Sequence, residues 1–453
     1  MSDEKSLDMN RRITEGVIWK QLLIFFFPIM LGSFFQQLYN TVDTIIVGQF
    51  VGTVALAAVG GSAAQVVNLI VGFFTGISTG ASVVITHHYG AEDEKGIFNA
   101  AHTAYAIALA GGLVLSLLGI FATPFLIHMM NTPEEVVPDS ILYLRVFFAG
   151  MVFVFVYNMG SSILRASGDS KNPLLYLIVC CFVNIILDIF FVLGMGLGVF
   201  GAAFATLIAQ ATSAILVTRK LVKMKGILYL RPRRIRFHKT SFIQQMKIGL
   251  PGGFESTTFA ITNIAIQASI NAFGTETVAA WSAFGKVDAI YWMMSIAFGT
   301  SITVFVGQNY GAGKIDRVHK STWVCMGMDF GISAVMVIVL ILFRNFLFSL
   351  FTSDPDVIKI GSHMLIMIAP MYLVYVIIEV LNGMFRGVGD VLIPALMTIF
   401  GICILRIIWL VFVMKEMPSI EGIVYSYPIS WIFTALFFVI YYFARYRRKK
   451  ETA

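Results

Sequence analysis

Charged residues are scarce in this chain of 453 residues. Asp, Glu, Lys and Arg together make up 13%, whereas a soluble domain averages about 25%. Hydrophobic residues make up 58%, and the mean hydropathy is +0.83. Charge this sparse, spread over long apolar runs, excludes an ordinary soluble protein and indicates a polytopic membrane protein. No sizeable soluble stretch is left over, which argues against a receptor or scaffold.

Cysteine and metal-binding patterns are also scarce. The metal-binding motifs CxxC and HExxH do not occur. The adjacent His87 and His88 would point about 100° apart on a helix, so they could not bind one metal ion from the same face. We therefore expect no metal other than Na⁺ and no organic cofactor. The sequence shows no nucleophile–base pair either, which argues against an intramembrane enzyme. Free, buried thiols are expected at all four cysteines, Cys180, Cys181, Cys325 and Cys403.

Twelve apolar runs follow a polar start. Each is long enough to cross about 30 Å of hydrocarbon as a helix. Because the first run is long and the residues before it are polar, we expect no cleavable signal peptide. The fold class predicted is an all-α polytopic membrane protein with twelve transmembrane helices. The runs lie near 20–46, 54–86, 99–123, 140–164, 173–195, 200–221, 245–272, 278–308, 321–350, 361–385, 392–414 and 422–445.

The positions of the basic residues predict the orientation. With the amino terminus inside, 26 of the 32 Lys and Arg residues lie in segments on the inner side, ten of them between Arg219 and Lys247. Such a bias predicts a multi-pass protein of the cell membrane with both termini in the cytoplasm. The basic stretch is interpreted as a loop that contacts membrane lipid, and no nucleic-acid partner is expected.

The two halves of the chain are an internal sequence repeat. Six apolar runs precede the basic stretch and six follow it. SSILRASGDSKNP (161–173) matches NGMFRGVGDVLIP (382–394), and HHYGAEDEK (87–95) matches QNYGAGKID (308–316), each at a shift of 221. We predict an N-terminal lobe at 1–222, a basic cytoplasmic linker at 223–244 and a C-terminal lobe at 245–453. Transporters built from such repeats place their sites between the halves.

Two carboxylates of the first half, Asp43 and Asp188, lie in apolar segments that contain no basic residue. A bare carboxylate in a bilayer costs several kcal/mol, so it must be protonated, paired or holding a cation. Asn184 lies four residues before Asp188, and Thr206 adds a hydroxyl. Such hard oxygen ligands suit Na⁺ or a proton; a structural network of neutral acids is the alternative. The supporting polar residues are Gln36, Tyr39, Asn40, Asn158 and Gln210.

The second half carries charges of both signs within its predicted spans. Two interpretations stay open: internal salt bridges, or a polar site for a cationic substrate. The residues concerned are Glu255, Asp288, Glu379, Lys286 and Arg406.

Several motifs together resemble the multidrug and toxic compound extrusion (MATE) family, and the prokaryotic DinF-like branch in particular. They are Pro28, QQLYNTVDTIIVGQFVGTVALAAVG, RASGDSKNP, RGVGDVLIP, NIILD and FGAAFATLIAQ, and the resemblance covers nearly the whole chain. It implies a V-shaped antiporter of two pseudo-symmetric six-helix bundles. Such an antiporter exports amphipathic, often cationic drugs in exchange for Na⁺ or H⁺. By resemblance, the cation site consists of Asp43, Asn184, Asp188 and Thr206.

A second interpretation stays within transporters. A flippase for a lipid-linked or polysaccharide precursor belongs to the same wider superfamily, but such proteins often have fourteen spans and a more basic cavity. We expect a monomer with a small-molecule substrate. The substrate and the coupling ion, Na⁺ or H⁺, stay open.

Overall fold

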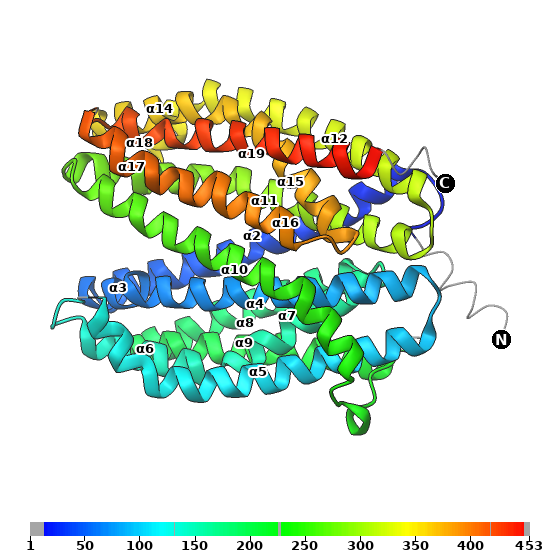
Figure 1. Cartoon of the computed structure of the whole chain (residues 1–453). Coiled ribbons are helices and arrows are strands. Elements are labelled where there is room, and N and C mark those ends of the chain that lie inside the picture. Colours follow the sequence, from blue (N-terminus) through cyan, green and yellow to red (C-terminus); the bar gives the residue numbers. More distant parts are fainter. Residues whose placement is uncertain (1–12, 131, 225–227, 417, 448–453) are drawn as a thin grey trace. The chain divides into compact units, whose positions relative to one another are not determined.

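The computed structural model describes residues 13–130, 132–224, 228–416 and 418–447, without the side chains of residues 413 and 447. Helices account for the secondary structure throughout these residues (Figure 1). All twelve apolar runs fall on helices, as predicted. Parts of the polar amino terminus, of the basic linker and of the basic carboxyl terminus lie outside the described residues.

The helices of the first half follow one another with short connections. Several are interrupted: α6 and α7 meet at Gly150 with a bend of 47°, and α8 continues as a π-helical turn, η1. The bounds are α2 Ile18–Phe50, α3 Thr53–Gly60, α4 Ser62–Gly90, α5 Glu94–Met129, α6 Val137–Ala149, α7 Met151–Ala166, α8 Lys171–Asp188, η1 Ile189–Gly194, α9 Gly198–Lys223 and η2 Pro232–Arg234.

The second half repeats this order. A shift of 221 residues takes the start of α2 at Ile18 to the start of α10 at Lys239, and takes both ends of α7 to both ends of α15. The bounds are α10 Lys239–Asn271, α11 Thr275–Gly311, α12 Ile315–Leu342, α13 Arg344–Ser349, α14 Pro355–Ile368, η3 Ala369–Met371, α15 Tyr372–Gly387, α16 Leu392–Thr398, η4 Ile399–Ile404, α17 Leu405–Glu416, α18 Ile420–Val424, α19 Ser426–Tyr442 and η5 Phe443–Arg447. The predicted pseudo-symmetry is thus present in the secondary structure.

Ten spans of the described chain are long and apolar enough to cross a membrane, and an eleventh arises if the bent pair α6–α7 counts as one. The one remaining predicted run, 245–272, forms the 33-residue helix α10, which does not reach the same apolarity. Its sequence explains the difference, because Glu255, Asn263, Gln267 and Asn271 dilute the apolar residues of this run.

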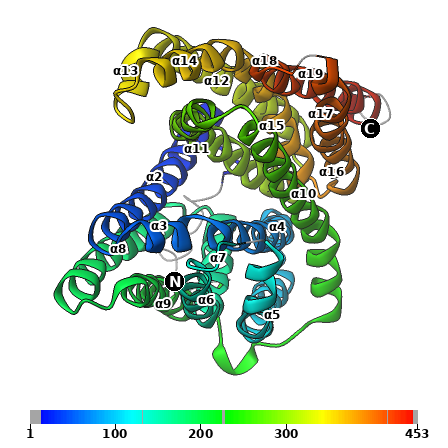
Figure 2. The same cartoon turned by 90° about the vertical axis from the view of Figure 1, so that its left-hand side faces the viewer.

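The chain separates into two compact units. Unit 1 consists mainly of Phe27–Gly253, with Gly311–Gly313; unit 2 consists of Gly16–Phe26, Phe254–Tyr310 and the chain from Lys314 onward. Helix α2 therefore starts in unit 2 and continues in unit 1, and α10 does the reverse. Figure 2 shows α5, α6, α7 and α9 of unit 1 nearly end-on, as a bundle. The lobe boundaries predicted from the sequence stay a prediction.

Glycines bring α4 and the first part of α10 into backbone contact within unit 1. A Cβ atom at Gly76 would meet the backbone of Gly252 and Gly253, and one at Gly80 would meet the backbone of Gln245 and Gly249. Rows of small residues let membrane helices approach in this way.

The described part of the basic linker is docked on α5. His102, fully buried on α5, accepts a hydrogen bond through Nε2 from the backbone N–H of Arg231 at 2.9 Å. The N–H of His238 donates to Thr103 Oγ1 at 3.1 Å. Just after the linker, Gln245 of α10 donates through Nε2 to the carbonyl of Ala100 at 2.8 Å. These bonds satisfy backbone groups that would otherwise need water.

The two matched segments 161–173 and 382–394 each contain a Gly-Asp turn, in which the glycine has a positive φ but the aspartate has different partners. Gly168 and Gly389 both adopt positive φ, 99° and 84°, which favours glycine. Asp169 accepts from the backbone N–H of Asn172 at 3.1 Å and so caps the start of α8. Asp390 instead accepts from two tyrosines, Tyr441 and Tyr446, at 2.6 and 2.8 Å.

Candidate functional site

The predicted cation-site residues lie on three helices of unit 1. Asp43 is on α2, Asn184 and Asp188 are one turn apart on α8, and Thr206 is on α9. Asp188 is the last residue of α8 before the π-helical turn η1 (Ile189–Gly194). Such π-turns are frequent at functional sites, because the extra residue per turn redirects neighbouring side chains.

All four side chains are buried. Asn184 and Asp188 are fully buried, and Asp43 and Thr206 are each 7% exposed. Asn184 Nδ2 donates a hydrogen bond to Thr206 Oγ1 at 3.3 Å, which links α8 to α9. The charges of Asp43 and Asp188 lie close enough to interact with each other. The structure therefore brings these residues into one neighbourhood.

The oxygen atoms of this neighbourhood are largely unsatisfied. Asp188 Oδ1, Asp188 Oδ2, Asp43 Oδ1 and Asn184 Oδ1 are buried without a hydrogen-bond partner. Neither aspartate forms an ion pair with Lys or Arg within the described ranges. Buried polar groups are nearly always hydrogen-bonded, so four orphaned acceptors in one place need an explanation. We call these three side chains, with Thr206, the acidic cluster.

The donor set of the acidic cluster fits a small hard cation. Carboxylate, amide and hydroxyl oxygens are the ligands that Na⁺ prefers, whereas transition metals favour imidazole and thiolate. In the described part of the chain, no group of three or more His, Cys, Asp and Glu side chains is arranged to hold a metal ion. The four cysteines are free and buried, as predicted.

The predicted supporting residues differ in burial and in hydrogen-bond partners. Tyr39 is buried, and its hydroxyl accepts a hydrogen bond from Gln210 at 3.3 Å, which joins α2 to α9. Asn158 donates instead to the carbonyl of Val154 on its own helix at 2.8 Å. Gln36 and Asn40 are exposed, so they are not part of the buried cluster.

Tyr143 was missed in the sequence analysis. It lies on α6, is 9% exposed and is close enough to both Asp43 and Asp188 to interact with them electrostatically. A tyrosine within an apolar helix carries no signal that separates it from a packing residue. Only the folded bundle brings it to the acidic cluster.

In unit 2, Glu255 is paired with a base. Arg386 Nη2 lies 3.1 Å from Glu255 Oε2, and Asn382 Nδ2 donates to Glu255 Oε1 at 3.1 Å. The sequence pointed instead to Lys286 and Arg406 as the bases within the spans of this half. The structural reason is that Arg386, in the last turn of α15, faces α10 rather than Asp390.

The other charged residues of unit 2 have separate partners. Asp288 accepts from Trp292 Nε1 at 2.6 Å and from the Tyr372 hydroxyl. Arg406, 3% exposed, donates through Nε to Ser430 at 2.9 Å, and its guanidinium lies 3.9 Å from the centre of the Tyr427 ring. Such stacking stabilises a buried guanidinium.

Unit 2 contains two further acids within its helices, Glu379 and Asp329. Glu379 accepts a hydrogen bond from Tyr375 at 3.4 Å, and its carboxylate occupies the space where Gly299 lacks a side chain. Asp329 on α12 was missed in the sequence analysis. It is fully buried, accepts from Ser333 at 3.1 Å and leaves Oδ2 without a partner. A single acid within the apolar run 321–350 was the available signal.

The comparisons with known proteins agree with this architecture. The chain is 27% identical to the probable multidrug resistance protein YoeA of Bacillus subtilis (strain 168), over 96% of each chain. It is similar to a solved outward-facing conformation of a multidrug resistance MATE family transporter of the MOP superfamily. That likeness has a TM-score of 0.90 at 24% identity and covers 97% of this chain and 98% of that one.

A second solved structure has the same fold, but its name suggests a different function. It is a MOP superfamily transporter from Pyrococcus furiosus, with a TM-score of 0.89 at 24% identity, covering 95% of this chain and 96% of that one. Its binding pocket is described as having reverse polarity, suggesting a different function. At such identities the structural likeness shows the fold alone.

The family profile described as MatE matches both halves of the chain, at residues 28–190 and 251–412. The two matched ranges begin at the two prolines, Pro28 and Pro251, which lie inside the corresponding helices α2 and α10. With most of the chain covered in both repeats, this multi-pass membrane protein belongs to the MatE family of transporters.

Proposed function

We propose that the protein is a secondary active antiporter that exports amphipathic, cationic organic compounds in exchange for Na⁺ or H⁺. The acidic cluster binds the coupling ion. The observation that carries the proposal is the set of four buried oxygen atoms on Asp43, Asn184 and Asp188 that have no hydrogen-bond partner. A cation or a proton supplies what these acceptors lack.

Electrostatics decides between this role and a purely structural one. Two interacting, buried carboxylates without a base cost several kcal/mol if both are ionised. A structural network would satisfy its acceptors, as the paired Glu255 of unit 2 does. The acceptors of the acidic cluster are instead unsatisfied. Binding of one positive charge therefore stabilises the occupied state strongly, which is the property a coupling site needs.

The exchange follows from competition between the two ligands. The cation binds Asp43 and Asp188 when the site is open to the outside, and it favours release of the exported compound. When the site is open to the cytoplasm, binding of that compound favours release of the cation. A coupling free energy of about 1–3 kcal/mol suffices for this competition.

A bend in α2 provides a physical route for the coupling. Pro28 lies inside this 33-residue helix, on the same helix as Asp43. Proline removes one backbone hydrogen bond and makes a helix bend at that point. Bending at Pro28 would change the surroundings of Asp43 and so link the ion to the exported compound.

The substrate class is proposed on two grounds. The Bacillus subtilis relative is named as a probable multidrug resistance protein. The described chain also offers many aromatic and methionine side chains and few unpaired interior bases, which suits an amphipathic xenobiotic cation. The protein is proposed to work as a monomer in the cell membrane, with both termini in the cytoplasm.

A transport assay tests the proposal. The purified protein is reconstituted in liposomes, and efflux of ethidium, a fluorescent amphipathic cation, is followed under an imposed Na⁺ gradient or pH gradient. We expect one gradient to drive efflux, and we expect Asp43→Asn and Asp188→Asn to lower the driven rate at least about tenfold, the effect of losing about 1.4 kcal/mol.

The matched control is Asp139→Asn, which removes a carboxylate of the same unit, in the first turn of α6. We expect this variant to transport at the wild-type rate. Gradient-driven efflux that is unchanged in both Asp43→Asn and Asp188→Asn would contradict the proposed site. Export that no cation gradient drives would contradict antiport.

A further inference from the structure

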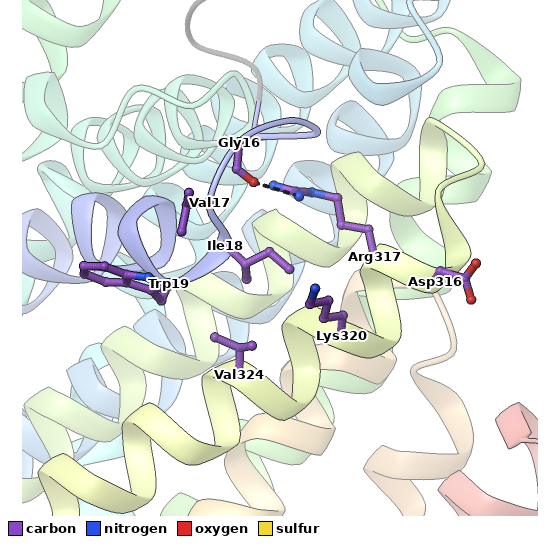
Figure 3. Close-up of a pocket in the computed structure, with 8 residues that line it drawn as sticks. All are labelled: Gly16, Val17, Ile18, Trp19, Asp316, Arg317, Lys320 and Val324. Atoms are coloured by element: carbon purple, nitrogen blue, oxygen red, sulfur yellow. Dashed lines mark hydrogen bonds between the residues drawn. The ribbon is translucent and has the colours of Figure 1, made fainter.

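A cavity of about 610 Å³ lies in unit 2 where α2 and α12 begin (Figure 3). Ile18 and Trp19 of α2 line one side, and Arg317, Lys320 and Val324 of α12 line the other. The transport mechanism proposed above does not use this cavity. Its position and chemistry together indicate a ligand.

The cavity lies at a boundary of the membrane. Two candidate spans, Ile18–Phe50 and Ile315–Leu342, both begin beside it. Trp19 at its edge is 47% exposed. Tryptophan is enriched at the level of the lipid headgroups, because its ring is apolar and its N–H is polar. A molecule in this cavity therefore meets headgroups rather than bulk hydrocarbon.

The cavity offers a free positive charge. Lys320 is exposed and has no carboxylate within ion-pair distance among the described residues. Arg317 is fixed by hydrogen bonds to the carbonyl of Gly16 and to Gln21 Oε1, both at 2.9 Å. Asp316 also belongs to the lining, but Figure 3 shows its carboxylate pointing away from Lys320. The first turn of α2 contains no acidic residue.

Exposed apolar side chains lie near the cavity on both helices. Val17, Ile18 and Val324 belong to the lining. Ile24, five residues after Trp19, is 58% exposed, and Trp323, next to Val324, is 52% exposed. A free anion would gain nothing from this surface. A ligand with an anionic head and hydrocarbon chains would contact both the lysine and the apolar side chains.

We propose that this cavity binds the phosphate headgroup of an anionic phospholipid, with Lys320 as the cation and the acyl chains along α2 and α12. Basic pockets between transmembrane helices are suited to such headgroups. The bound lipid would hold the start of α2 against α12, next to the existing bonds of Arg317. The proposal does not depend on antiport, and its test requires no transport.

Native mass spectrometry of the detergent-purified protein provides the test. The protein is titrated with palmitoyl-oleoyl phosphatidylglycerol and, separately, with the matching phosphatidylcholine. We expect preferential binding of phosphatidylglycerol. Lys320→Gln should weaken it about fivefold, the effect of one lysine near an anionic headgroup. Lys171→Gln, an exposed lysine at the start of another candidate span, should leave it unchanged.

A second pair of variants tests the cavity rather than the charge. Val324→Phe fills the space and keeps Lys320, so we expect binding to be lost. Val335→Phe adds the same ring on the same helix at a position that is 62% exposed, and binding should persist. Thermal melting of each variant confirms that it is folded.

Three results would overturn the proposal. Equal binding of phosphatidylcholine would show no headgroup recognition. Equal weakening by Lys320→Gln and Lys171→Gln would show general surface attraction. Displacement of phosphatidylglycerol by millimolar glycerol 3-phosphate would show a site for free anions rather than lipid. Failure of these experiments would leave the acidic cluster untouched, since that cluster lies in unit 1.

Discussion

The contact between α4 and α10 in unit 1 makes a quantitative prediction at Gly76. This residue is buried, and a Cβ atom there would overlap backbone atoms of Gly252 and Gly253. Backbone atoms cannot rotate away as a side chain can. Gly76→Ala must therefore push the two helices apart.

The magnitude comes from two opposing terms. Alanine stabilises a helix interior by about 1 kcal/mol relative to glycine, and inserting a methyl group into packed structure costs about 1–3 kcal/mol. Gly327→Ala on α12 is the matched control, because Gly327 is exposed and its added Cβ would have open space around it. Both variants gain the helix term, so their difference isolates the overlap.

Thermal unfolding of the purified variants measures this difference. We expect Gly76→Ala to be less stable than Gly327→Ala by about 1–3 kcal/mol, and Gly327→Ala to be at least as stable as the wild type. With an unfolding entropy of about 2 cal/mol/K per residue, that is a difference in Tm of roughly 1–3 °C. Equal Tm values for the two variants would refute the argument from backbone overlap.

Three other predictions concern charges and turns. Glu255→Gln leaves Arg386 without its ion-pair partner and should lower the Tm more than the double variant with Arg386→Met, as measured in a double-mutant cycle. Gly389→Ala forces a side chain into a backbone with φ of 84° and should destabilise the protein by about 1 kcal/mol or more, measured by thermal unfolding. The N–H of Gly96 lowers the pKa of Asp93, which caps α5. This cap stabilises the fold above the ordinary pKa of Asp and is lost as the pH falls through the lowered value. The drop in Tm on acidification below about pH 4 should therefore be smaller in Asp93→Asn than in the wild type.

Much of the fold could be predicted because each membrane helix corresponds to a continuous apolar run of the sequence. Each apolar run became a helix, and the shift of 221 between the sequence words recurs in the helix bounds. The apolar runs do not predict where the helices are interrupted. The π-helical turns η1 and η4 and the bend at Gly150 depend on how neighbouring helices pack.

In the candidate site, too, features of a single segment could be predicted, whereas contacts between distant segments could not. Asp43 and Asp188 could be found because a lone acid in an apolar segment is visible in sequence, and Asp329 carried the same signal. Among the residues that the structure describes, neither Asp43 nor Asp188 forms an ion pair with Lys or Arg. Tyr143 and the pairing of Glu255 with Arg386 could not be found, because each joins residues far apart in the chain. The role of the acidic cluster in transport stays a prediction.

The stability of Asp188→Asn with and without the coupling ion tests the central claim most directly. Thermal unfolding is compared in NaCl and in choline chloride at pH 8, and again in choline chloride at pH 6. We predict that Na⁺ or the lower pH stabilises the wild type, by about 2.7 kcal/mol at a hundred times the Kd of the ion. Asp188→Asn should be more stable than the wild type in choline chloride at pH 8, and it should lose the response to the ion. A variant that is less stable without the ion and keeps the full response would contradict the account.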